Sequence, residues 1–149
     1  MKSIAANLTV ILVLVLFCFN SNGQWATSAM SGSRSMLAGA GLGTKAVFAG
    51  GIGLISIPPP AADIYTSTSN TWMSSSISTG RTSLAAAASG SKVLFAGGAN
   101  DWIFAVYDQV DIYDVTNGSW TTSALSSARE KLAGASAGTK IVFAGGVDG

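Results

Sequence analysis

Side chains able to support acid–base or metal chemistry are few in this 149-residue chain. It contains no histidine, and its single cysteine is Cys18. Copper and zinc sites draw mainly on histidine and cysteine, and Ser–His or Cys–His nucleophilic pairs need a histidine. The sequence therefore predicts no catalytic residue, no metal site and no cofactor.

Four aspartates nevertheless lie close together, at positions 101, 108, 111 and 114. Such a cluster suggests either a calcium site or a pair of carboxylates for acid–base catalysis. Their spacing lacks the glycine and the glutamate of an EF-hand loop. Asp111 and Asp114 also flank a short apolar segment that recurs in the chain, so we expect them to be structural and predict that the chain is not an enzyme.

The segment 99–109 is a candidate binding loop, because it contains Asp101, Trp102, Phe104 and Tyr107. Recognition often resides in loops that a rigid scaffold positions, and exposed tryptophan and tyrosine are common anchors for a partner. In one interpretation, these residues form a surface that binds a protein or a glycan. In the alternative interpretation, the middle of the segment extends a strand or packs over a neighbouring sheet.

Three arginines, Arg34, Arg81 and Arg129, recur at one position of a repeat. One interpretation is a ring of positive charge that binds acidic ligands. The other is a structural ion pair or hydrogen bond repeated in each unit, with Asp63 or Asp111 as the partner. Recurrence in every unit favours the structural interpretation.

The elements that position these residues follow from the tetrapeptide Phe-Ala-Gly-Gly, which occurs three times with periods of 47 and 48 residues. Each arginine lies 16 residues before the first glycine of a pair, and a tryptophan lies nine residues before each arginine. Asp-Ile-Tyr also occurs twice. The repeated positions are Gly50, Gly51, Gly97, Gly98, Gly145, Gly146, Tyr65, Tyr113, Trp25, Trp72 and Trp120.

A period of this length suits four short strands joined by turns, as in a propeller blade. The run before each glycine pair is apolar without alternation, which is typical of a strand covered on both faces. Residues 83–89 are helix-like by composition, but the equivalent segments contain glycine, which is unfavourable inside a helix. Three equivalent segments must share one structure, so we predict strands.

Arg81, Gly97-Gly98, Tyr113 and Trp120 together form a set that resembles the kelch family. The resemblance implies an all-β, kelch-type β-propeller of four-stranded antiparallel blades. It implies about two and a half blades plus an N-terminal outer strand in an incomplete ring. Kelch domains serve many roles on one scaffold, so the resemblance says little about function. Some are copper oxidases, and the alternative function is part of an enzyme whose catalytic residues lie beyond Gly149.

The expected organisation begins with a basic start and an apolar run that resemble a secretory signal peptide, with cleavage near Gly23. A membrane anchor is the alternative, although the run is interrupted and short for a span. The sequence predicts a signal peptide over residues 1–23 and a partial propeller over residues 24–149. Within the propeller, the predicted parts are an outer strand (24–33), a first blade (34–80), a second blade (81–128) and half of a third blade (129–149).

The expected partners follow from charge and location. Without Lys2 the chain carries seven basic and seven acidic residues, so no basic surface for nucleic acid is predicted. We expect a secreted protein that leaves the membrane after cleavage, with Asn117 as a glycosylation candidate. The blade count predicts either a piece of a longer propeller or a short protein that self-associates through open blade edges.

Overall fold

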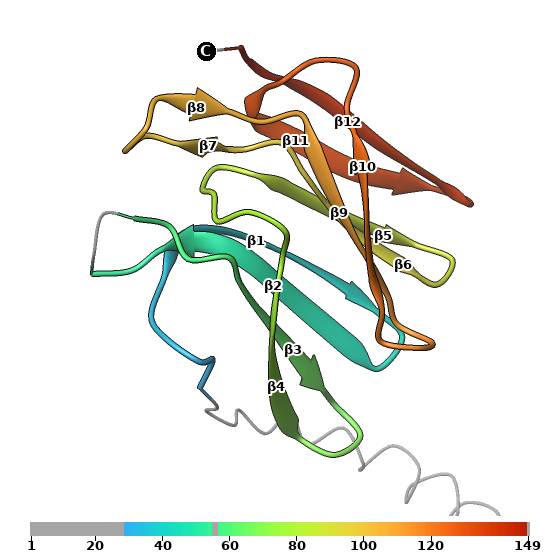
Figure 1. Ribbon diagram of the computed structural model, residues 1–149. Coiled ribbons are helices and arrows are strands. Elements are labelled where there is room, and N and C mark those ends of the chain that lie inside the picture. Colours follow the sequence, from blue (N-terminus) through green and yellow to red (C-terminus); the bar gives the residue numbers. More distant parts are fainter. Residues whose placement is uncertain (1–28, 55–56, 149) are drawn as a thin grey trace, which may run out of the picture.

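The computed structural model describes residues 29–54 and 57–148. Every regular element in this part of the chain is a β-strand (Figure 1). The strands are β1 (Ser35–Leu42), β2 (Lys45–Ile52), β3 (Ala61–Thr66), β4 (Thr71–Ser76), β5 (Ala85–Ser89), β6 (Lys92–Ala96), β7 (Ala99–Asn100), β8 (Ala105–Val106), β9 (Gln109–Asp114), β10 (Trp120–Ala124), β11 (Glu130–Ala137) and β12 (Lys140–Val147).

Predictions for the first 28 residues, which include the signal peptide, Cys18 and Trp25, lie outside the described residues. Among the residues that are described, no helix is long and apolar enough to cross a membrane.

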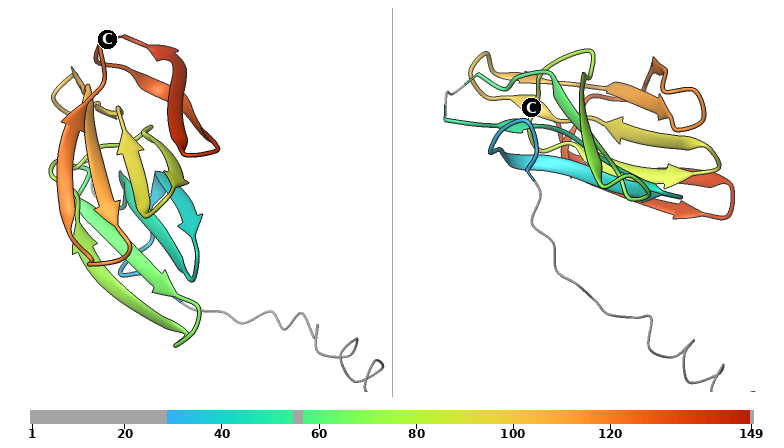
Figure 2. Two further views of the ribbon diagram at one scale, coloured as in Figure 1. Left: turned by 90° about the vertical axis from the view of Figure 1, so that its right-hand side faces the viewer. Right: turned by 90° about the horizontal axis from the view of Figure 1, so that it is seen from below.

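The strands form two four-stranded antiparallel sheets, with orders β1-β2-β3-β4 and β10-β9-β6-β5. β11 pairs with β12 in a third, two-stranded sheet, and β7 pairs with β8 in a small hairpin. The three larger sheets follow one another from the bottom to the top of Figure 1, and the views of Figure 2 show them stacked face to face. For the described residues, the prediction of an all-β fold with four-stranded antiparallel sheets is confirmed.

The helix-like segment 83–89 contributes strand β5, as the repeat predicted. β5 contacts β1 of the first sheet and β11 of the third, so these three strands lie side by side. Small residues are needed where they meet: a Cβ on Gly134 would lie 2.8 Å from the carbonyl oxygen of Ala86. Close approach of the backbones, and not helix propensity, therefore decides the composition of these strands.

The hydrophobic core lies between successive sheets. Val47, Ala49 and Ile64 of the first sheet are almost fully buried in one cluster with Leu84 and Val93 of the second repeat. A second cluster joins Ala85, Ala96 and Val110 to Leu132 of the third sheet. Each sheet thus buries its apolar face against its neighbour, and this burial is the main stabilising term.

The repeated tryptophans pack within each four-stranded sheet. The Trp120 ring lies 5.0 Å from Tyr113 and 6.0 Å from Phe95, measured between ring centroids. Trp72 has the equivalent contacts with the tyrosine and phenylalanine of the first sheet. The indole Nε1 of Trp120 also donates a hydrogen bond to Ser75 Oγ at 3.0 Å, which ties the second sheet to the first.

Candidate functional site

Arg81 is enclosed by its own repeat. Its Nε donates to the carbonyl oxygen of Gly97 at 2.7 Å, and its Nη2 lies 2.8 Å from Asp111 Oδ2. Arg34 makes the equivalent contacts, with the Gly50 carbonyl at 3.0 Å and with Asp63. The side chains of Arg34 and Arg81 are only 4% and 0% exposed. The ion pairs expected under the structural interpretation are present, and these two arginines do not form a ring accessible to acidic ligands.

Serines complete the carboxylate sites. Asp63 accepts hydrogen bonds from the Ser31 backbone N–H and hydroxyl, each at 3.0 Å, and Asp111 accepts one from the Ser78 N–H at 2.9 Å. Burial of Asp63 opposes its ionisation, but the hydrogen bonds from Arg34 and Ser31 outweigh that effect and hold its pKa below the usual value of 3.8. The signal for these donors is a serine three residues before each arginine, which sequence reasoning missed.

Arg129 differs from its two equivalents in its surroundings. Its Nη1 donates to the Gly145 carbonyl at 2.6 Å and its Nη2 to Ser127 Oγ at 3.1 Å, and both bonds are exposed. Among residues 29–54 and 57–148, no carboxylate forms an ion pair with Arg129. Arginine therefore holds the first glycine carbonyl of the pair in all three repeats.

The clustered aspartates do not converge on one site. Asp111 belongs to the ion pair with Arg81, while Asp114 pairs with Lys92 at 2.5 Å and accepts from the Thr116 N–H at 2.8 Å. The hydrogen bond from Lys92, with those from Thr116, holds the pKa of Asp114 well below its usual range. Within the described part of the chain, no three histidine, cysteine, aspartate or glutamate side chains lie close enough together to hold a metal ion.

The predicted binding loop forms the hairpin of β7 and β8, which projects beyond the stacked sheets at the upper left of Figure 1. Its tip exposes three successive large apolar side chains. Trp102 is 62% exposed, Ile103 is 59% exposed and Phe104 is 96% exposed. The alternative in which Phe104 packs over a neighbouring sheet is therefore wrong, and Ala105 alone continues into a strand. Tyr107 is half-buried, below the tip.

Backbone hydrogen bonds anchor the base of this hairpin to the segments that precede β5 and β11. Thr82 and Ala99 exchange hydrogen bonds of 2.8 and 2.9 Å. On the other arm, the Tyr107 N–H donates to the Gly98 carbonyl at 2.9 Å, and the Arg129 N–H donates to the Tyr107 carbonyl at 3.2 Å. The tip therefore stands on a base that is bonded to the second and the third repeat.

Asn100 shapes the tip. It is 9% exposed, its Oδ1 accepts from the Trp102 N–H at 3.1 Å, and its carbonyl accepts from the Ile103 N–H at 3.2 Å. Phe104 has a φ of 52°, in the left-handed region that side-chain-bearing residues seldom adopt. Sequence reasoning did not select Asn100, although asparagine before a turn is a recognised signal.

A hollow of about 450 Å³ opens beside the tip. Its lining is Ala99, Asp101, Phe104, Ala105, Val106 and Glu130. Lys131 pairs with Glu130 at 2.8 Å. The hydrogen bond from Lys131 to Glu130, with a weaker attraction from Asp101, raises the pKa of the lysine. The hollow therefore combines an apolar wall with two carboxylates and one neighbouring cation.

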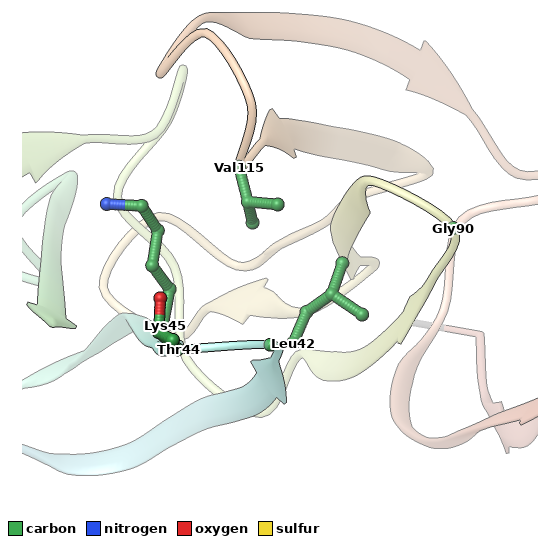
Figure 3. A pocket seen from close by; sticks show the side chains of 6 residues that line it. Leu42, Thr44, Lys45, Gly90 and Val115 are labelled. Atoms are coloured by element: carbon green, nitrogen blue, oxygen red, sulfur yellow. The ribbon is translucent and has the colours of Figure 1, made fainter. Parts of the chain in front are cut away.

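Another hollow, of about 400 Å³, lies near Leu42, Lys45, Gly90 and Val115 (Figure 3). Leucine, valine and the stem of Lys45 provide most of the side-chain surface shown there. The Lys45 Nζ donates to Thr66 Oγ1 at 3.4 Å. Lys45 is the one charged residue in this lining, whereas the hollow beside the hairpin has two carboxylates and an aromatic ring. The hairpin is therefore the stronger candidate for a binding site.

Comparison with known proteins supports the fold. No protein-family model and no curated protein matches the sequence. Among solved structures, one described as "Structure of YjhT" is similar, with a TM-score of 0.70 and 17% sequence identity over 83% of this chain. The chain spans 41% of the length of that structure. YjhT is propeller-like, so the stacked antiparallel sheets of this chain share a propeller-like arrangement.

Proposed function

We propose that this chain is a secreted binding module built from kelch-type propeller blades, and that the tip of the β7–β8 hairpin contacts a protein partner. The observation that carries the proposal is the exposure of Trp102, Ile103 and Phe104 side by side on an anchored hairpin. No catalytic role is proposed.

The tip of the hairpin exposes apolar surface to water. Burying a large apolar side chain is worth about 1.5–3 kcal/mol, and the tip leaves three of them in solvent. Neighbouring aromatic anchors of this kind dominate many protein interfaces. The hydrogen bonds at Thr82, Ala99 and Tyr107 limit the motion of the base, so less conformational entropy is lost on binding.

The chemistry of the hairpin tip favours a protein over a glycan. Ile103 and Phe104 present aliphatic and aromatic carbon without a polar atom, whereas a sugar offers hydroxyl groups along most of its surface. Asp101 and Glu130 lie beside this apolar area. A partner with an apolar side chain next to a lysine or arginine would match both features.

The kelch assignment and the location rest on the sequence. The arginine, the glycine pair, the tyrosine and the tryptophan recur at constant spacing, and the buried pairs Arg34–Asp63 and Arg81–Asp111 give the arginine a structural reason to recur. The first 23 residues support secretion. Asn117 lies exposed in the turn before β10, which suits glycosylation.

The test compares two variants with the purified wild-type chain. Extracellular proteins captured by the wild type are identified and purified, and their affinities are measured by titration calorimetry. Trp102→Ala/Phe104→Ala is expected to weaken binding by about tenfold or more. Met73→Ala is the matched control, because Met73 is 51% exposed on β4, away from the hairpin.

Two results would contradict the proposal. Equal affinity of the wild type and the double variant would show that the tip is not the binding surface. Binding on a glycan array that the double variant loses, with no protein ligand, would keep the tip as the site and overturn the choice of a protein partner.

A further inference from the structure

The lysines that open β2 and β6 occupy equivalent places in the first and second repeats. Lys45 is the first residue of β2, and Lys92 is the first residue of β6. Where each strand pairs with the next strand of its sheet, Lys45 stands opposite Thr66 and Lys92 stands opposite Asp114. One register position therefore holds a neutral side chain in the first repeat and a carboxylate in the second.

This difference leaves Lys45 without a counter-ion. The Lys92 Nζ lies 2.5 Å from Asp114 Oδ2, whereas the Lys45 Nζ donates to the hydroxyl of Thr66 at 3.4 Å. All seven acidic residues of the chain lie within residues 29–54 and 57–148, and none of them forms an ion pair with Lys45 there. The positive charge of Lys45 is therefore available to an anionic ligand.

The residue opposite each lysine on the preceding strand also differs. Leu42 pairs with Lys45, and Ser89 pairs with the lysine of the second repeat. The Ser89 hydroxyl donates to the Gly138 carbonyl of the third sheet at 2.8 Å. At the equivalent place between the first and second sheets, Leu42 and Gly90 line a hollow. Leucine thus provides an apolar wall where the next pair of sheets has a hydrogen bond.

This hollow of about 400 Å³, here called the Lys45 hollow, lies between two complete four-stranded sheets, at the turns that follow β1, β5 and β9 (Figure 3). Its lining is Leu42, Gly43, Thr44, Lys45, Gly90 and Val115. Leu42 and Val115 pack against the hydrophobic core. The Val115 N–H also donates to the Ser91 carbonyl at 2.9 Å. The walls are therefore held by the sheets, and the volume lies in the range of small-molecule pockets.

The lining determines what chemistry the hollow can bind. Leu42 and Val115 favour an aliphatic group, because burying it removes apolar surface from water. Lys45 is the one charged residue of the lining and favours a carboxylate, which accepts strong charge-assisted hydrogen bonds from an ammonium group. Gly43 and Gly90 are exposed at the turns and offer no side chain to anchor a protein partner. The combination favours a small amphiphilic anion.

We infer that the Lys45 hollow binds a small aliphatic monocarboxylate, with the carboxylate on Lys45 Nζ and the aliphatic chain between Leu42 and Val115. The site is separate from the hairpin tip. β6 begins near the hollow and ends at Ala96, shortly before the hairpin, so the two lie at opposite ends of this strand. Binding in the hollow therefore does not depend on the proposed contact between the hairpin and a protein partner.

The first experiment locates the ligand. Octanoate is titrated into the purified full chain, and the backbone amide signals are followed by NMR. The signals of Gly43, Thr44 and Gly90 are expected to shift and to saturate. Acetate has the same carboxylate with almost no aliphatic chain, so it is expected to bind at least about tenfold more weakly. The absence of a saturable shift at millimolar octanoate, shifts confined to the hairpin, or equal affinity for acetate would overturn the inference.

The second experiment isolates the charge. Thr66→Asp gives Lys45 the carboxylate that Lys92 has in the second repeat, so it is expected to keep the fold and to weaken octanoate binding by about tenfold or more. Lys45→Gln removes the charge and is expected to weaken binding by a similar factor.

The matched control is Lys140→Gln. Lys140 opens β12, at the equivalent place in the third repeat. This variant changes the net charge as Lys45→Gln does and is expected to bind octanoate like the wild type. Unchanged affinity in Thr66→Asp and Lys45→Gln would overturn the inference, and so would an equal loss in Lys140→Gln.

Discussion

Replacing Arg81 by alanine should destabilise the protein far more than the same replacement at Arg129, although both occupy one position of the repeat. Arg81→Ala leaves the Asp111 carboxylate, which is 2% exposed, without its cation. It also removes the donor to the Gly97 carbonyl at 2.7 Å and the donor to Thr79 at 3.1 Å. Breaking a buried ion pair from one side costs about 3–5 kcal/mol.

Arg129→Ala removes exposed hydrogen bonds to Gly145 and Ser127 and leaves no partner charge buried. A typical hydrogen bond contributes about 0.5–1.5 kcal/mol. The two variants should therefore differ by about 2 kcal/mol or more in free energy of unfolding. Urea unfolding followed by tryptophan fluorescence measures the difference, and an unchanged m-value shows that the denatured state is unaffected.

A third variant tests the cause of the loss. Arg81→Met/Asp111→Leu removes both charges together, and replacing a buried pair by apolar residues is often close to neutral. This variant is expected to be more stable than Arg81→Ala. Equal losses for Arg81→Ala and Arg129→Ala would refute the reasoning from burial. If the double variant is no more stable than Arg81→Ala, the loss of stability comes from the carbonyl groups of Gly97 and Thr79 that lose their donor, and not from the unpaired Asp111 carboxylate.

Three further predictions concern acid, glycine and the hairpin. The pKa of Asp63 is lowered from its ordinary value of 3.8, so the unfolded state binds more protons than the folded state in acid. The stabilising effect of Asp63 is therefore complete at pH values above 3.8 and is lost as the pH falls through the pKa of the folded state. Asp63→Asn should accordingly make stability less dependent on pH in an acid titration followed by circular dichroism. Gly97→Ala should cost about 1–3 kcal/mol more than Gly145→Ala in urea unfolding, because both share left-handed φ angles of 64° and 76° but only the Gly97 Cβ meets a carbonyl oxygen at 2.3 Å; equal losses would leave backbone strain as the whole cause. Trp102→Ala/Phe104→Ala should change the free energy of unfolding by less than about 1 kcal/mol, since both side chains are exposed; a larger loss in thermal unfolding would place them in the core.

The sequence was sufficient for the strands of the repeated segments. Lysine opens β2, β6 and β12, and the apolar run that follows lies in a strand in each repeat. The segment 83–89 shows why repetition was needed, since its own alanines favour a helix and only the glycines of its equivalents exclude one. The pairing of Arg81 with Asp111 was also predicted as one of two alternatives, because recurrence in each repeat implies a structural demand.

Burial had to come from the tertiary structure. Arg81 and Arg129 stand in equivalent sequence surroundings, yet the first is fully buried within its own repeat, whereas the second is half-buried and its hydrogen bonds are exposed. The hairpin of β7 and β8, the exposure of Phe104 and the role of Asn100 likewise depend on which sheets lie beside the loop. Local pattern determines which residues form a strand, because that choice depends on nearby residues. Exposure depends on surfaces brought from distant parts of the chain, so only the assembled sheets decide which repeated residues stabilise the fold and which remain free to bind.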